Sequence, residues 1–156
     1  DMRTPSMKLV QRKTSYSPQT VLDAQMSLPY CVAVSILKGR AFIDEFTERK
    51  IRDARILGLA KKIEARGAAD LDEIPVGELY CPARATLITR DGKRYSSFVK
   101  YSKGEPENPL TIEELHEKFR FCARKVLNKS KTEKIIDFVS RLEKAADVAR
   151  LARFLC

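Results

Sequence analysis

The chain has 156 residues and a mass of 17.8 kDa, with 44% hydrophobic and 33% charged residues. This length suits either one domain with a substantial core or one compact domain with a short helical appendage, and it is too small for a two-domain enzyme. The composition argues against a disordered or collagen-like chain. The 30 Lys and Arg against 21 Asp and Glu give a net charge of +9, which favours an anionic partner, either nucleic acid or a small polycarboxylate.

The basic residues are dispersed along the chain, mostly beside Asp or Glu, as on solvated helix faces rather than in a nucleic-acid footprint. No apolar run is long enough to span a membrane. The first residues hold no starting methionine, no apolar stretch and no small-residue cleavage site, so we expect no secretory signal and a chain cut from a longer polypeptide.

The four cysteines lie far apart, without a C-x-x-C pair or a histidine at metal-ligand spacing; they are Cys31, Cys81, Cys122 and Cys156. Cys31 and Cys122 fall on apolar helical stretches, where a thiol behaves as a small hydrophobe. We therefore expect no zinc site and a reduced, cytoplasmic protein.

Up to Pro18 the sequence is polar and weakly patterned, with at most a short strand at residues 8–10. The following stretch to Lys38 is apolar, and Ser27 is predicted to cap a helix there because Pro29 is tolerated only in a first turn. Gly39 stands where this helix should end. Since every face of the stretch is apolar, the helix is predicted to be buried all round at the centre of the domain.

Asp53 is predicted to cap a second helix, whose core face would consist of Ile56, Leu57, Ala60 and Ile63. A short strand is predicted at residues 62–66. Two antiparallel strands, Leu79–Arg90 and Arg94–Tyr101, should then form a hairpin. Asp91-Gly92 between them predicts a type I′ turn, in which both central residues have positive φ.

Glycine and prolines make residues 102–109 a loop. The capping box Thr111-x-x-Glu114 should open a helix with an apolar stripe of Ile112, Leu115, Phe119, Cys122 and Val126. A second box, Ser130-x-x-Glu133, should open a helical stretch that runs to Phe154, with apolar positions Ile135, Phe138, Val139, Leu142, Leu151 and Leu155.

The order helix, helix, hairpin, helix, helix favours an α+β class over a parallel βαβ sheet. The expected architecture is a small antiparallel sheet with a buried central helix and flanking helices. The apolar face of the C-terminal helices needs a surface to pack against, and we expect that surface to lie on a helical domain outside these residues.

Common catalytic signatures are missing, and His116 has no second histidine to pair with, so a structural role is favoured over a general base. Tyr30 lies in the first turn of the apolar helix, beside Ser27, where free N–H groups create a positive end. Its phenol could donate to an anion or satisfy a core carbonyl. Lys103 and Gly104 follow the second strand, on a loop that either lines a site or is a plain turn.

Residues 23–33, DAQMSLPYCVA, resemble the A-x-F-S-x-P-Y-x-x-A stretch of the MmgE/PrpD family, with Met26 in place of the usual aromatic residue. The family includes 2-methylcitrate dehydratases, cis-aconitate decarboxylases and iminodisuccinate epimerases. Agreement extends to Arg90–Lys93 in the hairpin and to Lys103–Leu115, followed by Lys118-Phe119. Three stretches in the right order and spacing make the resemblance specific from about Pro18 to the C-terminus.

The resemblance implies the C-terminal part of a longer enzyme. Residues 1–127 would form its smaller α+β domain, and residues 128–156 a helical tail packed on the N-terminal helical domain of the same protein. It implies a lyase without metal or redox cofactor, acting on a small di- or tricarboxylate in a cleft between the two domains. Dehydration of 2-methylcitrate is the first candidate, and cis-aconitate decarboxylation or epimerisation are alternatives. A cytoplasmic homodimer is expected, with no nucleic acid or membrane as partner.

The family's catalytic tyrosine corresponds to Tyr30, which would act as a proton donor. Ser27, Lys103 and Gly104 are expected to bind the substrate, and this chain alone is expected to be inactive. Two other readings stay open: a stand-alone basic binding module, and an inactive homologue kept as an interaction subunit.

Overall fold

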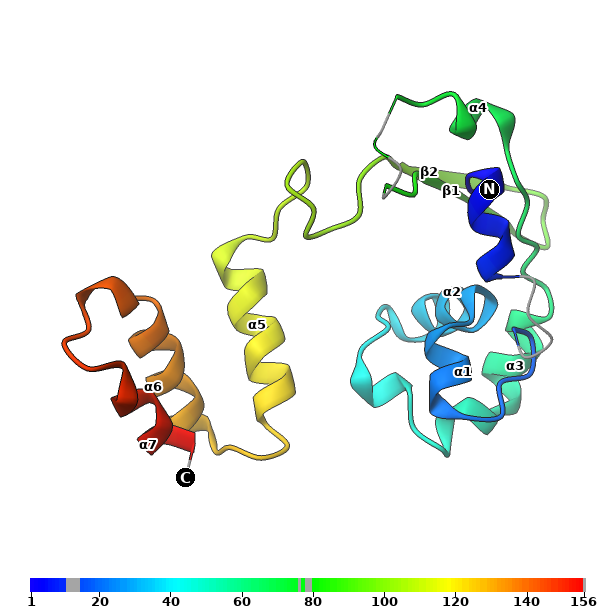
Figure 1. The fold of residues 1–156 in the computed structure, drawn as a ribbon. Coiled ribbons are helices and arrows are strands. Elements are labelled where there is room, and N and C mark those ends of the chain that lie inside the picture. The colour runs from blue at the N-terminus through cyan, green and yellow to red at the C-terminus, as the bar shows by residue number, and fades with distance from the viewer. Residues whose placement is uncertain (11–14, 76, 78–79, 156) are drawn as a thin grey trace. The chain divides into compact units, whose positions relative to one another are not determined.

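The computed structural model describes residues 1–10, 15–75, 77 and 80–155 (Figure 1). It divides into two compact units, Asp1–Ser102 (unit 1) and Lys103–Cys156 (unit 2). Helices and one small antiparallel sheet confirm the α+β class. The predicted division at residue 127 concerns packing on a domain outside this chain, and it stays a prediction.

Three helices build the core of unit 1: α1 (Val21–Gln25), α2 (Leu28–Lys38) and α3 (Ala54–Ala60). Ser27 caps α2 as predicted, because its side chain accepts a hydrogen bond from the Tyr30 N–H at 3.1 Å. The helix ends at Gly39, whose φ of 70° is the left-handed conformation that glycine adopts without strain. Asp53 caps α3, also as predicted.

The buried core of unit 1 consists of Ala24, Tyr30, Ala33, Val34, Ile51, Ile56 and Ala60. Ile56 and Ala60 confirm the predicted core face of α3, and Leu57 and Ile63 pack against the cluster. The prediction that α2 is buried all round is wrong, since Ile36 and Leu37 in its last turn are 49% and 44% exposed. The reason is length: α1 and α3, with 5 and 7 residues, are too short to cover all 11 residues of α2.

Short helices connect the rest of unit 1: 3₁₀-helices at Thr4–Leu9, Ile43–Glu45 and Lys50–Arg52, and α4 at Ala69–Asp72. The strand predicted at residues 8–10 is wrong, because Pro5 opens a 3₁₀-helix that runs through Leu9. The strand predicted at residues 62–66 is also wrong. That segment lacks strand structure, and pairing occurs only just beyond it, at a single bridge between Gly67 and Met2.

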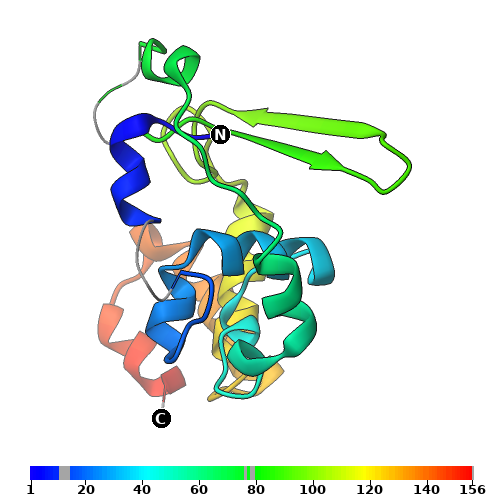
Figure 2. The same cartoon turned by 90° about the vertical axis from the view of Figure 1, so that its right-hand side faces the viewer.

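The predicted hairpin is confirmed as β1 (Ala83–Ile88) and β2 (Arg94–Val99), which pair antiparallel (Figure 2). Both strands are shorter than predicted, and Leu79, where the first was expected to begin, lies outside the described residues. The predicted type I′ turn is wrong because only Gly92 has a positive φ, of 82°. The Gly92 N–H donates to the Thr89 carbonyl at 3.0 Å, and the Thr89 N–H donates to the Lys93 carbonyl at 2.9 Å. This is a three-residue loop that ends in a left-handed glycine.

The first two helices of unit 2 are α5 (Ile112–Ala123) and α6 (Lys129–Val139). The first capping box is confirmed by two reciprocal hydrogen bonds between Thr111 and Glu114, at 2.8 and 3.2 Å. The second box is wrong. Asn128 caps α6 by accepting a hydrogen bond from the Lys131 N–H at 2.9 Å, so Ser130 already lies inside the first helical turn.

The helical stretch predicted to run to Phe154 is confirmed, but it is divided into several separate helices. Beyond α6 the chain forms only short helices, Leu142–Lys144, Val148–Leu151 and α7 (Ala152–Leu155). Asp147 accepts a hydrogen bond from the Ala149 N–H, a local cap that competes with a continuous helix. Cys156 and the Leu155 side chain, both named in the sequence predictions, lie outside the described part.

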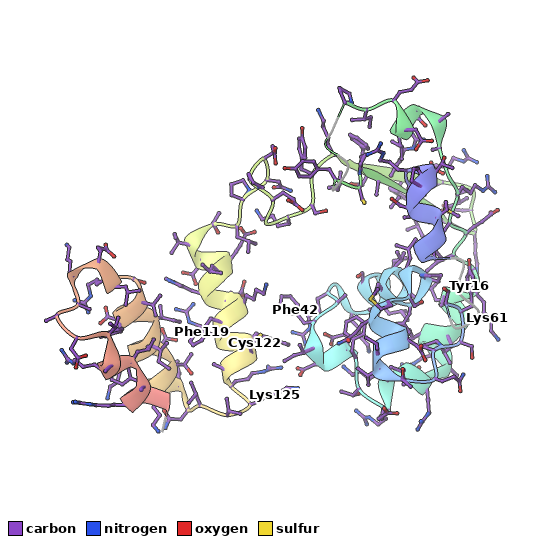
Figure 3. The ribbon with its side chains drawn as sticks, in the orientation of Figure 1. Tyr16, Phe42, Lys61, Phe119, Cys122 and Lys125 are labelled. Atoms are coloured by element: carbon purple, nitrogen blue, oxygen red, sulfur yellow. The ribbon has the colours of Figure 1, made fainter. Side chains whose placement is uncertain are left out.

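The predicted apolar stripe of α5 lies largely on the surface of unit 2. Ile112, Leu115 and Val126 are 69%, 50% and 84% exposed. The other two members of the predicted stripe, Phe119 and Cys122, are labelled on α5 in Figure 3. Among the side chains of unit 2 that the structure describes, the buried ones are instead Ala123, Thr132, Ile135 and Ile136.

Candidate functional site

The two predicted site residues of unit 1 meet at the start of α2. Ser27 is 1% exposed, and its hydroxyl accepts from the Tyr30 N–H and donates to the backbone carbonyl of Ser15. The Tyr30 side chain is fully buried, and its hydroxyl donates to the backbone carbonyl of Glu45 at 2.8 Å. The Phe46 ring packs beside it, with ring centroids 5.7 Å apart. Both hydroxyls are therefore hydrogen-bonded inside unit 1.

A buried carboxylate, Glu45, lies next to this pair. Its side chain is 2% exposed and accepts hydrogen bonds from the Lys50 ammonium at 3.2 Å and from the Phe42 N–H at 3.1 Å. The Arg40 guanidinium lies 3.5 Å from the same carboxylate. Burial acts to raise the pKa of Glu45, but the hydrogen bonds and the two cations outweigh it and lower this pKa overall. Glu45 is thus a charged group inside the fold at neutral pH.

The pKa of the Tyr30 phenol is shifted upward, in the opposite direction from the pKa of Glu45. Burial, followed by the neighbouring acidic groups Cys31, Asp53 and Glu45, raises the pKa of Tyr30 to about 12. The hydroxyl therefore keeps its proton at neutral pH and can act only as a donor or as a weak acceptor.

The role of Glu45 was missed from the sequence. Arg40, Glu45 and Lys50 are spaced five residues apart, which matches neither the helical nor the strand period. Their meeting depends on the 3₁₀-helices Ile43–Glu45 and Lys50–Arg52 between α2 and α3. The one available signal was an acidic residue placed between Phe42 and Phe46, two large apolar side chains.

The other two predicted site residues lie in unit 2, on the loop before α5. The Lys103 ammonium lies 3.0 Å from the Glu114 carboxylate, which also accepts from the Thr111 N–H at the start of α5. Gly104 has a φ of 100°, and its N–H donates to the Asn108 carbonyl at 2.8 Å. The structure thus brings Ser27 together with Tyr30 in unit 1. In unit 2 it places Lys103 beside Glu114 at the start of α5, and Gly104 within the preceding loop.

His116 lies on α5 with 23% of its side chain exposed. Its Nε2 is 3.5 Å from the Ser140 hydroxyl at the end of α6, and its Nδ1 is 4.0 Å from the Glu113 carboxylate. The first contact joins α5 to the end of α6, and the second lies within α5, as expected for a structural histidine.

Within the described residues, no group of three or more His, Cys, Asp or Glu side chains is arranged to hold a metal ion. The same residues contain no helix with the length and apolar character needed to cross a membrane. Cys31, Cys81 and Cys122 are free thiols.

Ser27→Ala is expected to lower the free energy of unfolding by about 2 kcal/mol, because α2 loses its N-cap and the buried Ser15 carbonyl loses its donor. Urea unfolding of the full-length protein measures this loss. The matched control is Ser35→Ala on the exposed side of α2, expected to cost less than about 0.5 kcal/mol. Equal losses at the two positions would contradict the assignment of the cap.

Comparison with known proteins places most of the chain in one family. Residues 1–144 match the sequence model of the MmgE/PrpD C-terminal domain. The cis-aconitate decarboxylase of Mus musculus is 28% identical over 154 residues, which cover 99% of this chain and 30% of that protein. The cis-aconitate decarboxylase of Homo sapiens is 29% identical over 155 residues, which cover 99% of this chain and 31% of that protein. The cis-aconitate decarboxylase-like protein oryM of Aspergillus oryzae is 28% identical over 134 residues, which cover 86% of this chain and 27% of that protein. The chain therefore spans about 30% of the length of these relatives.

Proposed function

The chain belongs to the MmgE/PrpD family, and we propose that it forms the C-terminal domain of a longer lyase that acts on a small tricarboxylate. The observation that carries this proposal is the match of residues 1–144, together with the similarity to cis-aconitate decarboxylases along nearly the whole chain. Decarboxylation of cis-aconitate is therefore the first candidate reaction. Dehydration of 2-methylcitrate, the reaction predicted first from the sequence, becomes the second.

Decarboxylation leaves an electron pair on carbon, so the reaction needs a proton donor and a positive environment for the developing charge. Tyr30 is the proposed donor, supported by a phenol that stays protonated at neutral pH. Its hydroxyl donates to the Glu45 carbonyl in a fully buried position. Proton donation to a substrate therefore requires this hydrogen bond to open.

Substrate binding is proposed for Ser27, Lys103 and Gly104. The Lys103 side chain is 46% exposed, and its ammonium could exchange the Glu114 carboxylate for a substrate carboxylate. The net charge of +9 would attract a polyanion to the protein. The N-terminal helical domain of the same protein would complete the site in a cytoplasmic homodimer.

The proposal is tested by supplying the full-length protein with cis-aconitate and 2-methylcitrate in separate reactions, and following CO₂ release and water loss. We expect CO₂ from cis-aconitate and no turnover of 2-methylcitrate. Dehydration without CO₂ release would assign the protein to the second reaction. No turnover of either, with salt-sensitive binding to nucleic acid, would favour the basic binding module.

A further inference from the structure

The first two residues of the chain lie along the outer edge of β1. Met2 forms an antiparallel bridge with Ala83 and a parallel bridge with Gly67. The Asp1 amino group donates to the Arg84 carbonyl at 2.7 Å, and the Arg84 N–H donates to the Asp1 carbonyl at 3.0 Å. The side chains of these two residues also meet, with Arg84 Nε 3.0 Å from Asp1 Oδ2. Asp1 and Arg84 thus form a hydrogen-bonded antiparallel pair, the geometry of two neighbouring strands.

The same edge of β1 continues beyond Arg84. The Thr89 N–H bonds to the Lys93 carbonyl across the hairpin, so the odd-numbered residues of β1 direct their backbone groups to β2. Backbone groups alternate between the two edges of a strand, so those of Thr86 and Ile88 point outward, as those of Arg84 do. Two further positions for a strand partner therefore follow the pair that Asp1 occupies.

The hairpin of β1 and β2 exposes several large apolar side chains to solvent. The exposed large side chains are Leu87, Ile88, Tyr95, Phe98 and Val99, at 47–57%. A two-stranded ribbon is marginally stable in water, and an open strand edge is prone to pairing with another chain. Both properties indicate that a further strand belongs beside β1.

We propose that the residues immediately preceding Asp1 in the full-length protein continue as a β-strand along the outer edge of β1. The result is a three-stranded antiparallel sheet with β1 in the middle. The reason to expect an upstream segment is that residues 1–144 match a C-terminal domain and the chain covers only about 30% of the length of its relatives. The proposal does not depend on which reaction the enzyme catalyses.

The pairing of Asp1 with Arg84 fixes the register of this strand. The residue immediately before Asp1 lies opposite Ala85, the second opposite Thr86 and the third opposite Leu87. The first and third share a sheet face with Leu87 and Tyr95, so they are expected to be apolar. The second lies on the other face.

Amide hydrogen exchange in the full-length protein tests the proposal directly. If the strand is present, the Thr86 and Ile88 amides exchange at least about a hundredfold more slowly than unprotected amides, as the Leu87 amide does. Fast exchange at Thr86 and Ile88 beside a protected Leu87 would overturn the proposal.

Disulfide trapping tests the register and the identity of the partner. A cysteine in place of the residue immediately before Asp1 is combined with Ala85→Cys, a non-hydrogen-bonded pair whose Cα atoms lie within disulfide range. The matched control keeps the first cysteine and uses Thr86→Cys, whose side chain is on the opposite face. We expect an intramolecular disulfide only with Ala85→Cys, identified by peptide mass mapping because the chain has native cysteines. Equal yields at both positions, or a disulfide between two copies through position 85, would overturn the proposal. If the Ala85→Cys variant fails to fold, the exchange measurement on the unaltered protein decides.

Discussion

Replacing Tyr30 with phenylalanine is expected to lower the kcat of the full-length protein on cis-aconitate, its proposed substrate, by about a hundredfold, the contribution of a positioned proton donor. The ring remains and keeps its packing beside Phe46. The substitution also removes the donor to the buried Glu45 carbonyl, which should lower the free energy of unfolding by about 1–2 kcal/mol. Steady-state kinetics and urea unfolding of the same preparation separate the two effects.

Tyr16→Phe is the matched control. The Tyr16 hydroxyl also donates to a backbone carbonyl, that of Ile63 at 3.1 Å, but Tyr16 is 38% exposed. We expect unchanged kcat there and a stability change within about 0.5 kcal/mol. If Tyr30→Phe loses stability and keeps its turnover, Tyr30 has no part in the chemistry and serves only to hold the Glu45 segment against α2.

Glu45→Ala is expected to lower the free energy of unfolding by about 3 kcal/mol. The substitution leaves the Phe42 N–H without its acceptor and the Lys50 ammonium without its carboxylate, and it opens a cavity in the core of unit 1. Urea unfolding of the full-length protein measures the loss. The control is Glu48→Gln, which removes an exposed ion pair with Arg52 and should change stability little.

Comparing the pH dependence of stability in Glu45→Gln and in the unaltered protein isolates the contribution of the Glu45 negative charge to folding. The folded-state pKa of Glu45 lies below its ordinary value of 4.5, so its stabilising contribution is complete above pH 4.5 and is lost as the pH falls through the folded-state pKa. The unaltered protein should therefore lose more stability than Glu45→Gln on acidification below pH 4.5. Parallel pH profiles would show that the Glu45 charge contributes nothing to folding.

Local signals in the sequence predicted where helices begin and end. Ser27, Asp53 and Thr111 cap their helices through side-chain contacts two or three residues away, and Gly39 ends α2 with a positive φ. Such contacts need only neighbouring residues, so a pattern in the sequence is enough to predict them. Asn128 was missed because Ser130 and Glu133 matched the same motif two residues later.

Features that depend on distant segments were not predictable in this way. The exposed end of α2 follows from the lengths of α1 and α3, which no pattern within α2 predicts. The turn type was missed for a local reason, because only Gly92 has a positive φ where the Asp91-Gly92 pair predicts two such residues. In the candidate site, Tyr30 and Ser27 were predicted together because they are three residues apart. Glu45 was not predicted as part of the site, because it lies 15 residues from Tyr30 in the sequence. Caps are local, whereas the partners of buried groups are set by how the segments pack.

The ion pairs of Arg120 make the contact between α5 and α6 in unit 2 sensitive to the ionic strength of the solution. Arg120 contacts Glu133 at 2.8 and 3.1 Å and Glu113 at 2.8 Å, and so links α5 to α6 at the surface. Dissolved salt screens such exposed charges, with a Debye length of about 8 Å at physiological ionic strength, and reaches buried pairs such as Glu45 and Lys50 far less. The ionic strength of the buffer therefore acts selectively: high salt loosens the helical pair of unit 2 while the charged core of unit 1 stays closed.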